Sequence, residues 1–251
     1  VVTAPLRIAV AGLGTVGCGT IAILEGRREL LAARCGRPLE ITAVSARRRD
    51  KERPVPIAGY RWHDDPASLA AADDVDVVLE LMGGEDGPAL ALTRAALEAG
   101  KHVVTANKAL LAHRGGELAR RAEAAGVVLA YEAAVAGGIP IVKALRDGLA
   151  GNRIESVVGI LNGTCNFILT TMREQGRDFA DVLAEAQALG YAEAEPSLDV
   201  DGYDAAHKLA LLASIAFGTE PAFDQLHIEG IRPIAPIDIA FAEELGYRIK
   251  L

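Results

Sequence analysis

The stretch LRIAVAGLGTVGCGTIAIL, residues 6–24, carries the pattern that decides the fold. Its first six residues form an apolar run that predicts a β-strand, and the pattern from about 15 to 33 predicts an α-helix. Between the two lie Gly12, Gly14 and Gly17, with the spacing G-x-G-x-x-G. A strand, a glycine turn and a helix in this order predict a dinucleotide-binding unit. A glycine-rich turn without a ligand is the alternative.

Each glycine has a separate expected task in such a unit. Gly12 permits the tight turn, Gly14 lets a pyrophosphate approach the backbone, and Gly17 lets the helix pack closely on the strand. The first turn of the helix then offers backbone N–H groups and a positive dipole end to the phosphates. The predicted cofactor contacts therefore include Thr15 and Val16 beside the three glycines.

The alternation of strands and helices continues through the first half of the chain. Further strands are expected at 39–46, 74–81, 101–106 and 126–133, and helices at 85–99 and 109–125. This order predicts an α/β domain with a doubly wound parallel sheet of the Rossmann type over residues 1–136. Ligands of such sheets bind beyond the carboxyl ends of the strands.

Two strand ends carry candidate cofactor residues. Enzymes that use NAD usually have an acid after the second strand, but here the strand is followed by Arg47 and Arg48. An arginine can pair with a 2′-phosphate, so the sequence favours NADP over NAD; a solvated basic loop is the alternative. Asn107 and Lys108 follow the strand at 101–106, where Lys108 is placed to contact substrate or cofactor.

The bulk composition narrows the function classes. The chain has 251 residues, of which 51% are hydrophobic and 24% charged, as in soluble globular proteins. A net charge of −8 argues against a nucleic-acid partner. No stretch has the length of a membrane span, and no signal peptide is predicted. The three scattered cysteines are typical of reduced thiols in a cytoplasmic protein.

The alternation breaks after a predicted hinge at Gly137, Gly138 and Pro140, so a second domain is expected over 137–251. For this domain the sequence predicts a strand at 153–161 and helices at 141–149, 165–175, 179–188 and 202–217.

An acid-rich segment, GYAEAEPSLDVDGYDAAHKLALLAS, covers residues 190–214. Asp201 is the expected N-cap of the last helix, and Asp204 and Lys208 are four residues apart on one face. The helix beyond Lys208 is apolar nearly all round and is therefore expected to be buried. A lysine that is partly desolvated and held by acids suits general acid–base chemistry; an exposed ion pair is an equally weighted alternative.

Together the motifs GLGTVG, VVTANKALLA, YEAAVAGGIP, GILNGTCNFIL and GYAEAEPSLDVDGYDAAHKLALLA resemble those of homoserine dehydrogenase. The resemblance implies interconversion of L-homoserine and L-aspartate 4-semialdehyde with NADP or NAD, in the route to threonine and methionine. It also implies an α+β domain that binds the substrate and pairs two subunits in a homodimer.

The same resemblance implies roles for single residues. Lys208 would protonate the aldehyde oxygen, and Lys108 would be the second lysine near nicotinamide and substrate. Glu193 and Asp204 would bind the substrate ammonium or orient Lys208, with Asp199 in support. The loop YEAAVAGGI resembles one that holds a monovalent cation, usually sodium, mainly by backbone carbonyls, here those of Glu132, Val135, Gly137 and Ile139; a hinge without an ion is the alternative.

Two departures from the family pattern leave other functions open. Glu195 stands where the family usually has aspartate, and the chain is expected to be truncated within the substrate domain. A non-catalytic or truncated NAD(P)-binding relative is therefore one alternative. Another semialdehyde dehydrogenase is a second, with Cys165 at a helix start as its nucleophile.

Overall fold

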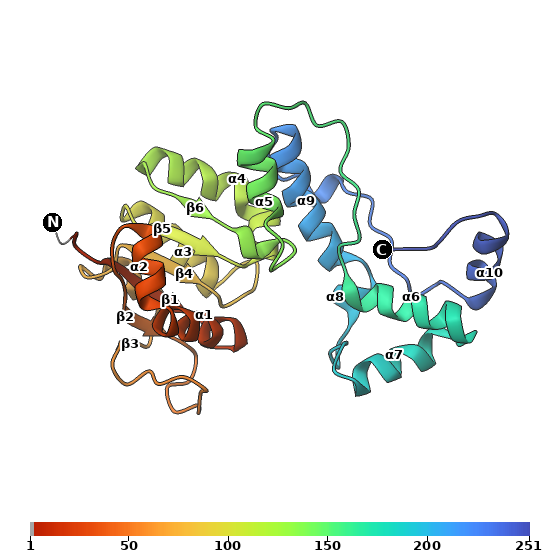
Figure 1. The fold of residues 1–251 in the computed structure, drawn as a ribbon, viewed down its shortest axis with the longest axis horizontal. Helices are drawn as coiled ribbons and strands as arrows, with labels where there is room; N and C mark the ends of the chain where they lie inside the picture. Colours follow the sequence, from red (N-terminus) through yellow and green to blue (C-terminus); the bar gives the residue numbers. More distant parts are fainter. Residues whose placement is uncertain (1–2) are drawn as a thin grey trace. The chain divides into compact units, whose positions relative to one another are not determined.

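A computed structural model describes residues 3–251, which divide into two compact units between Gly148 and Leu149 (Figure 1). The boundary predicted after residue 136 falls inside the first unit. The carboxylate of Glu132 accepts hydrogen bonds from the backbone N–H groups of Val142, at 3.0 Å, and Lys143, at 2.9 Å. These bonds hold the residues after the predicted hinge to the first unit.

The first unit contains a six-stranded sheet in which all neighbouring strands are parallel. The strand order is β3-β2-β1-β4-β5-β6, which is that of a doubly wound dinucleotide-binding fold and confirms the predicted class. The strands are β1 (Leu6–Ala11), β2 (Leu39–Ser45), β3 (Arg61–His63), β4 (Val77–Glu80), β5 (His102–Thr105) and β6 (Leu129–Ala130). The order reverses between β1 and β4, where ligands of this fold bind.

Alternate residues of the strands pack on opposite layers of helices, as a period of two requires. On one face, Ile8 and Val10 of β1 pack with Cys18 and Ile21 of α1 (Thr15–Gly26). The other face includes Ala9 and Ala11, and it packs with buried residues of α3 (Pro88–Glu98), α4 (Lys108–Ala125) and the 3₁₀ turn Pro66–Ala71.

Several predicted boundaries in the first unit need correction. The helix predicted at 15–33 is two helices, α1 and α2 (Arg28–Cys35), separated at Arg27. Strand β3 was not predicted. Of the strand predicted at 126–133 only two residues pair, because a 3₁₀ turn begins at Glu132. The helix predicted at 141–149 is a short α5 (Ile141–Lys143) followed by a π-helical turn, Ala144–Gly148.

The second unit is built of helices around its own core. They are α6 (Gly163–Gln175), α7 (Phe179–Ala188), α8 (Ser197–Val200), α9 (Tyr203–Phe217) and α10 (Pro236–Glu244). Ile168, Met172, Val182 and Ile231 are among the buried side chains that pack together here. Among residues 3–251, no helix is long and apolar enough to cross a membrane.

Two predictions for the second unit are wrong. Residues 153–161 have no strand partner in the part of the chain that the structure describes, and Val158 is 94% exposed. An extended segment without a hydrogen-bonded neighbour is not a strand, so the expected β component is not formed within this unit. Asp201 is not the N-cap of α9: it follows α8, and Gly202 in the left-handed region precedes α9.

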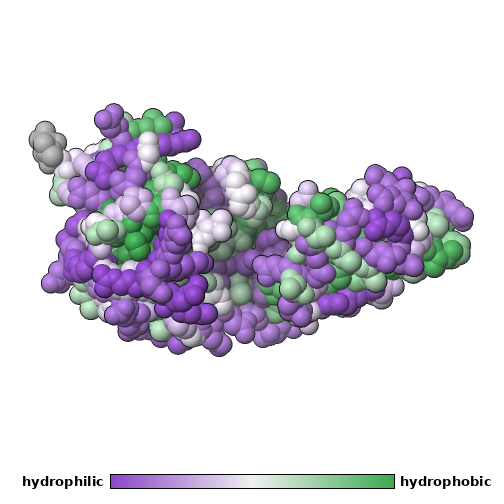
Figure 2. Space-filling view, turned by 90° about the horizontal axis from the view of Figure 1, so that it is seen from below, coloured by the Kyte–Doolittle hydropathy of each residue, from purple (hydrophilic) through white to green (hydrophobic). Residues whose placement is uncertain are grey.

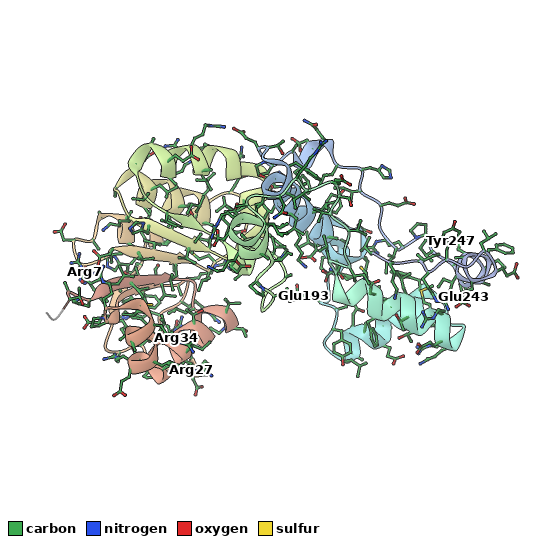
Figure 3. All side chains as sticks on the ribbon, turned by 45° about the horizontal axis from the view of Figure 1, so that its top comes forward. Arg7, Arg27, Arg34, Glu193, Glu243 and Tyr247 are labelled. Carbon is green, nitrogen blue, oxygen red and sulfur yellow. The ribbon has the colours of Figure 1, made fainter. Side chains whose placement is uncertain are left out.

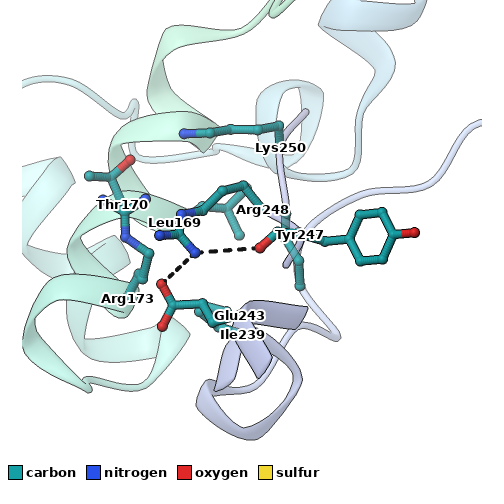
Figure 4. A pocket seen from close by; sticks show the side chains of 9 residues that line it. Leu169, Thr170, Arg173, Ile239, Glu243, Tyr247, Arg248 and Lys250 are labelled. Carbon is teal, nitrogen blue, oxygen red and sulfur yellow. Dashed lines mark hydrogen bonds and ion pairs between the residues drawn. The ribbon is translucent and has the colours of Figure 1, made fainter. Parts of the chain in front are cut away.

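The molecular surface is largely hydrophilic on the face drawn in Figure 2, with apolar patches between. A small pocket lies where α6 meets the segment after α10 (Figure 4). Arg248 reaches across it to Glu243 at 2.7 Å. The space left is about 10 Å³, about the least that holds one water molecule, so this pocket is no candidate for a ligand.

Candidate functional site

The glycine turn between β1 and α1 has the geometry that its sequence predicts. A side chain on Gly12 would place Cβ 2.4 Å from the carbonyl oxygen of Leu81, and one on Gly17 would place it 1.9 Å from that of Gly12. Nothing lies within 4 Å of the corresponding position on Gly14. The first and third glycines are therefore required for packing, and the second leaves the backbone open to a ligand.

Helix α1 begins at this turn without a capping side chain or an acid in its first turn. The first N–H groups of a helix have no partner within the helix. Thr15, Val16 and Gly17 supply these groups here, and the positive end of the helix dipole adds to them. The helix start can hold a phosphate group.

A pocket of about 640 Å³ opens beside the glycine turn, within the size range of small-molecule sites. Gly12 and Gly14 line it together with Ser45, at the end of β2, and Leu81 and Met82, after β4. The site thus lies at the switch point of the sheet, where the fold predicts it.

Four cations line this pocket, Arg47, Arg48, Lys51 and Arg53, against a single acid among its lining residues, Asp64. The chain as a whole has a net charge of −8, so this local positive charge is opposite to the general one. A pocket of this charge suits an anionic ligand. Arg47 and Arg48, the two arginines predicted to contact the cofactor, are among these lining residues.

Arg53 organises the basic loop in a way that the sequence did not reveal. Its guanidinium donates to the carbonyl oxygens of Lys51, at 2.7 Å, Arg49, at 3.2 Å, and Arg48. It also lies 5.6 Å from the ring centre of Trp62 on β3, within cation–π range. The loop is thereby folded around one side chain, which fixes the backbone that carries Arg47 and Arg48.

Asn107 and Lys108 lie at the start of α4, at the carboxyl edge of the sheet. The Asn107 side chain accepts a hydrogen bond from the N–H of Leu110 and caps the helix. Lys108 is the first helical residue, where the dipole disfavours a cation. Neither residue is among those that line the pocket beside the glycine turn, nor are Thr15, Val16 and Gly17.

The predicted cation loop is compact and irregular. Val135 is fully buried, and Ala136 has a φ of 49°, the one positive value of a non-glycine residue among residues 3–251. The carbonyl of Glu132 accepts from the N–H of Val135 at 3.4 Å, and that of Ile139 from Ile141 at 2.8 Å. Each of these oxygens has a second lone pair for another contact.

In the second unit, Lys208 lies in a cluster of acidic side chains. Its Nζ donates to Oδ2 of Asp204 at 2.6 Å and to the carbonyl oxygen of Leu161 at 2.7 Å. The side chains are 19% and 8% exposed for the lysine and the aspartate. The pair is therefore not the exposed ion pair that was the alternative.

Asn162 joins the acids of this cluster. Its amide donates to Oδ1 of Asp199 at 2.7 Å and to Oδ2 of Asp204 at 2.9 Å, and its oxygen accepts from the N–H of Cys165 at 2.9 Å. One buried side chain thus caps α6 and supplies a donor to each of two carboxylates. No role was predicted for Asn162 from the sequence, although an Asn three residues before a helical Cys has the spacing of an N-cap.

Glu193 lies on the loop between α7 and α8 and is exposed (Figure 3). Its carbonyl oxygen accepts from the amide of Gln187 at 3.0 Å, which fixes the backbone rather than the carboxylate. Glu195, where the family pattern has aspartate, accepts from the N–H of Ser197 at 3.1 Å. The longer side chain is accommodated by a local turn.

Cys165 is not an activated nucleophile. It is fully buried, and burial, with smaller contributions from Asp199, Asp204 and Asp201, raises the pKa of its thiol to about 12. A catalytic cysteine needs a lowered pKa. The burial and the raised pKa of this thiol argue against the alternative that used Cys165 as a nucleophile.

Comparisons with known families cover nearly all of the chain. Residues 12–132 match the family described as "Homoserine dehydrogenase, NAD binding domain" and residues 140–251 match "Homoserine dehydrogenase". The loop at 133–139 lies between the two matched segments. The first unit is thus an NAD-binding domain by sequence as well as by topology.

Individual proteins that the chain is similar to carry the same family name. The chain is 52% identical over 248 residues to a homoserine dehydrogenase of Neisseria gonorrhoeae, covering 98% of this chain and 56% of that relative. The crystal structure of a homoserine dehydrogenase from Thiobacillus denitrificans matches with a TM-score of 0.94 and 48% identity, over 99% of this chain and 57% of that one.

A hyperthermophilic archaeal homoserine dehydrogenase mutant, solved in complex with NADPH, matches at 26% identity and a TM-score of 0.81, over 93% of this chain and 76% of that one. The chain spans about half the length of the curated relatives it matches.

Proposed function

Because the chain belongs to the homoserine dehydrogenase family, we propose that it supplies the cofactor site and proton donor of an enzyme that interconverts L-homoserine and L-aspartate 4-semialdehyde. The observation that carries the proposal is the setting of Lys208. An ammonium has three protons, and Lys208 donates two of them, to Asp204 and Leu161, which leaves a third for a substrate oxygen.

The chemistry in the direction of reduction follows from this setting. NADPH, when bound, supplies the hydride for the aldehyde carbon. Lys208 gives its third proton to the aldehyde oxygen, which becomes the hydroxyl of homoserine, and the neutral amine regains a proton from solvent. Asp204 and the Leu161 carbonyl hold Nζ in one direction while this happens. In oxidation the proton moves the opposite way.

Other residues are assigned to the substrate. Glu193 is exposed on the loop before α8, and its carboxylate suits the ammonium group of homoserine. Asp199 is bound to Asn162 and supports the cluster. Lys108 at the start of α4 is assigned to the substrate or nicotinamide, in keeping with its unfavourable place at a helix N-terminus.

NADP is the preferred cofactor in this proposal. Support comes from the four cations of the pocket beside the glycine turn and from the arginines that replace the acid expected for NAD after β2. Arg47 and Arg48 are assigned to the 2′-phosphate. Gly14 and the start of α1 are assigned to the pyrophosphate.

A monovalent cation, sodium in the first instance, is assigned to the carbonyls of Glu132, Val135, Gly137 and Ile139. The left-handed backbone of Ala136 supports this, since strained residues gather at ligand clamps. Hard cations also take oxygen ligands. A higher melting temperature in sodium chloride than in choline chloride of equal ionic strength is expected, with the difference lost in V135P. Equal melting temperatures of the wild type in the two salts would refute the assignment.

A homodimer is also proposed, through the second unit. Residues 153–161 run extended with Val158 and Ile160 exposed, and an unpaired extended segment can pair with a strand of another chain. Light scattering that gives one chain's mass at micromolar concentration would refute it.

One assay tests the central proposal. The 251-residue chain is mixed with L-homoserine and NADP⁺, and formation of NADPH is followed. Homoserine-dependent NADPH formation is the expected result. Cofactor binding without turnover would instead support the alternative of a non-catalytic NAD(P)-binding relative.

A further inference from the structure

Glu80, the last residue of β4, is a fully buried carboxylate that the proposed reaction does not use. Its Oε2 accepts from the hydroxyl of Thr105 at 2.6 Å. Its Oε1 accepts from the N–H groups of Met82, at 2.8 Å, and Gly83, at 3.3 Å. Burial of a carboxylate among neutral donors is costly unless each oxygen is hydrogen-bonded, so these contacts hold it tightly.

The contacts of Glu80 belong to a ring of hydrogen bonds that the backbone between Gly83 and Gly84 closes. Thr105 Oγ1 accepts from the N–H of Asn107 at 2.9 Å, and the Asn107 amide donates to the carbonyl of Gly84 at 2.7 Å. The ring joins the loop after β4 to the turn after β5. Gly83 and Gly84 adopt φ values of 83° and 90°, a path that the bonds to Glu80 and Asn107 fix.

This loop forms one wall of the pocket beside the glycine turn. Leu81, Met82 and Gly83 line the pocket, and Gly12 packs against the carbonyl of Leu81. The basic residues come from the other side of the switch point, after β2. A dinucleotide that places its 2′-phosphate on the basic side therefore directs its nicotinamide half toward the loop after β4.

We propose that Glu80 is a positioning residue for the nicotinamide half of the cofactor. It fixes the wall at Met82 and Gly83 and, through Thr105, the turn that carries Asn107 and Lys108. This inference rests on the proposed cofactor site. It predicts that a change at Glu80 weakens contacts of the nicotinamide half and leaves those of the adenosine half unchanged.

The test compares two ligands. NADP⁺ contains both halves, whereas adenosine 2′,5′-bisphosphate contains the adenosine half alone. Their dissociation constants are measured by calorimetry for the wild type, E80Q and the control E123Q, the same change on the exposed face of α4. The expected result is a rise of about tenfold in the Kd of E80Q for NADP⁺, as for one charge-assisted hydrogen bond. Its Kd for the bisphosphate stays within about twofold, and E123Q matches the wild type.

A second pair of variants keeps the test decisive should E80Q fold poorly. T105V removes the hydroxyl that binds Glu80, and T105S keeps it. T105V is expected to show the same selective loss of affinity for NADP⁺ as E80Q. T105S is expected to bind NADP⁺ with the affinity of the wild type. Equal losses for both ligands, or no loss in T105V, overturn the inference. A wild type that does not bind NADP⁺ overturns the proposed cofactor site as well, so the two failures are distinct.

Discussion

The Nζ atom of Lys208 lies 2.6 Å from Oδ2 of Asp204, one helical turn earlier on α9. Both side chains are largely shielded from water, and the pair is therefore oriented more firmly than an exposed ion pair of the same spacing. The second acceptor, the carbonyl of Leu161, comes from the segment just before α6. Two acceptors from two segments fix the direction of the remaining proton.

Replacement of Lys208 by alanine is expected to lower kcat about 10²- to 10⁴-fold, the usual contribution of a general acid. Cofactor binding is expected to survive, because the cofactor pocket is built within the first unit. Steady-state kinetics and the quenching of Trp62, the single tryptophan, measure the two effects separately. An unchanged kcat in the variant would remove Lys208 from its assigned role.

Asn162 is expected to control the stability of the acid cluster. In N162L both carboxylates lose a donor, and the free energy of unfolding is expected to fall by about 2–4 kcal/mol. In N162D a third carboxylate faces two others, so destabilisation is larger at pH 8 than at pH 5, where the added group takes up a proton. Urea unfolding at the two pH values measures this, and N152D supplies the same change at an exposed site. A pH-independent loss in N162D would contradict the prediction.

The first unit was the more predictable from the sequence, for a physical reason. Ile8 and Val10 alternate with Ala9 and Ala11, and the glycines follow directly, so the sheet and its turn are encoded within a few consecutive residues. Lys208 and Asp204 were predicted as a pair because a helix places residues four apart on one face.

What remained hidden depends on contacts between residues far apart in the chain. Asn162 binds Asp204 across 42 residues, and Glu80 binds Thr105 across 25. An acid at the end of an apolar strand marks Glu80 in the sequence as a residue of interest. Nothing in the sequence indicates that Thr105 is its partner. Residues 153–161 have the sequence pattern of a strand but, among the described residues, no neighbouring strand to pair with. A local sequence pattern cannot show whether such a neighbour is present.

Arg47 and Arg48 are expected to determine cofactor preference. Loss of one charge-assisted contact to a 2′-phosphate in R47A or R48A is expected to raise the Kd for NADP⁺ about 10- to 100-fold. The Kd for NAD⁺ should change by less than about threefold, since NAD⁺ lacks that phosphate. The exposed Arg34 on α2 provides R34A as a control with the same loss of charge (Figure 3). Equal weakening of both cofactors would remove the argument for NADP.

The amino ends of β1 and β4 are joined by an ion pair whose effect depends on pH. Hydrogen bonds from Arg7 lower the pKa of Asp76 from 3.8 to about 2. A carboxylate with a lowered folded-state pKa contributes stability above its unfolded pKa, and this is lost as pH falls toward the folded value. D76N is therefore expected to be less stable than the wild type at pH 7, with the difference shrinking between about pH 4 and pH 2. Melting temperatures across this range test it, with D50N as an exposed control; a constant difference would contradict the assignment.

The thiols are expected to react in the order of their exposure. Cys35 is exposed, whereas Cys18 and Cys165 are buried, and the pKa of Cys165 is raised to about 12. Iodoacetamide at pH 8 should therefore alkylate Cys35 in the native chain and leave Cys165 intact until the chain unfolds, as peptide mass spectrometry would show.

C165S is expected to retain turnover, because the thiol contributes a weak hydrogen bond to the carbonyl of Asp199 and no nucleophile. Loss of turnover in C165S at unchanged stability, or NADP⁺ reduction that depends on added phosphate and the semialdehyde, would restore the cysteine mechanism that the buried thiol argues against.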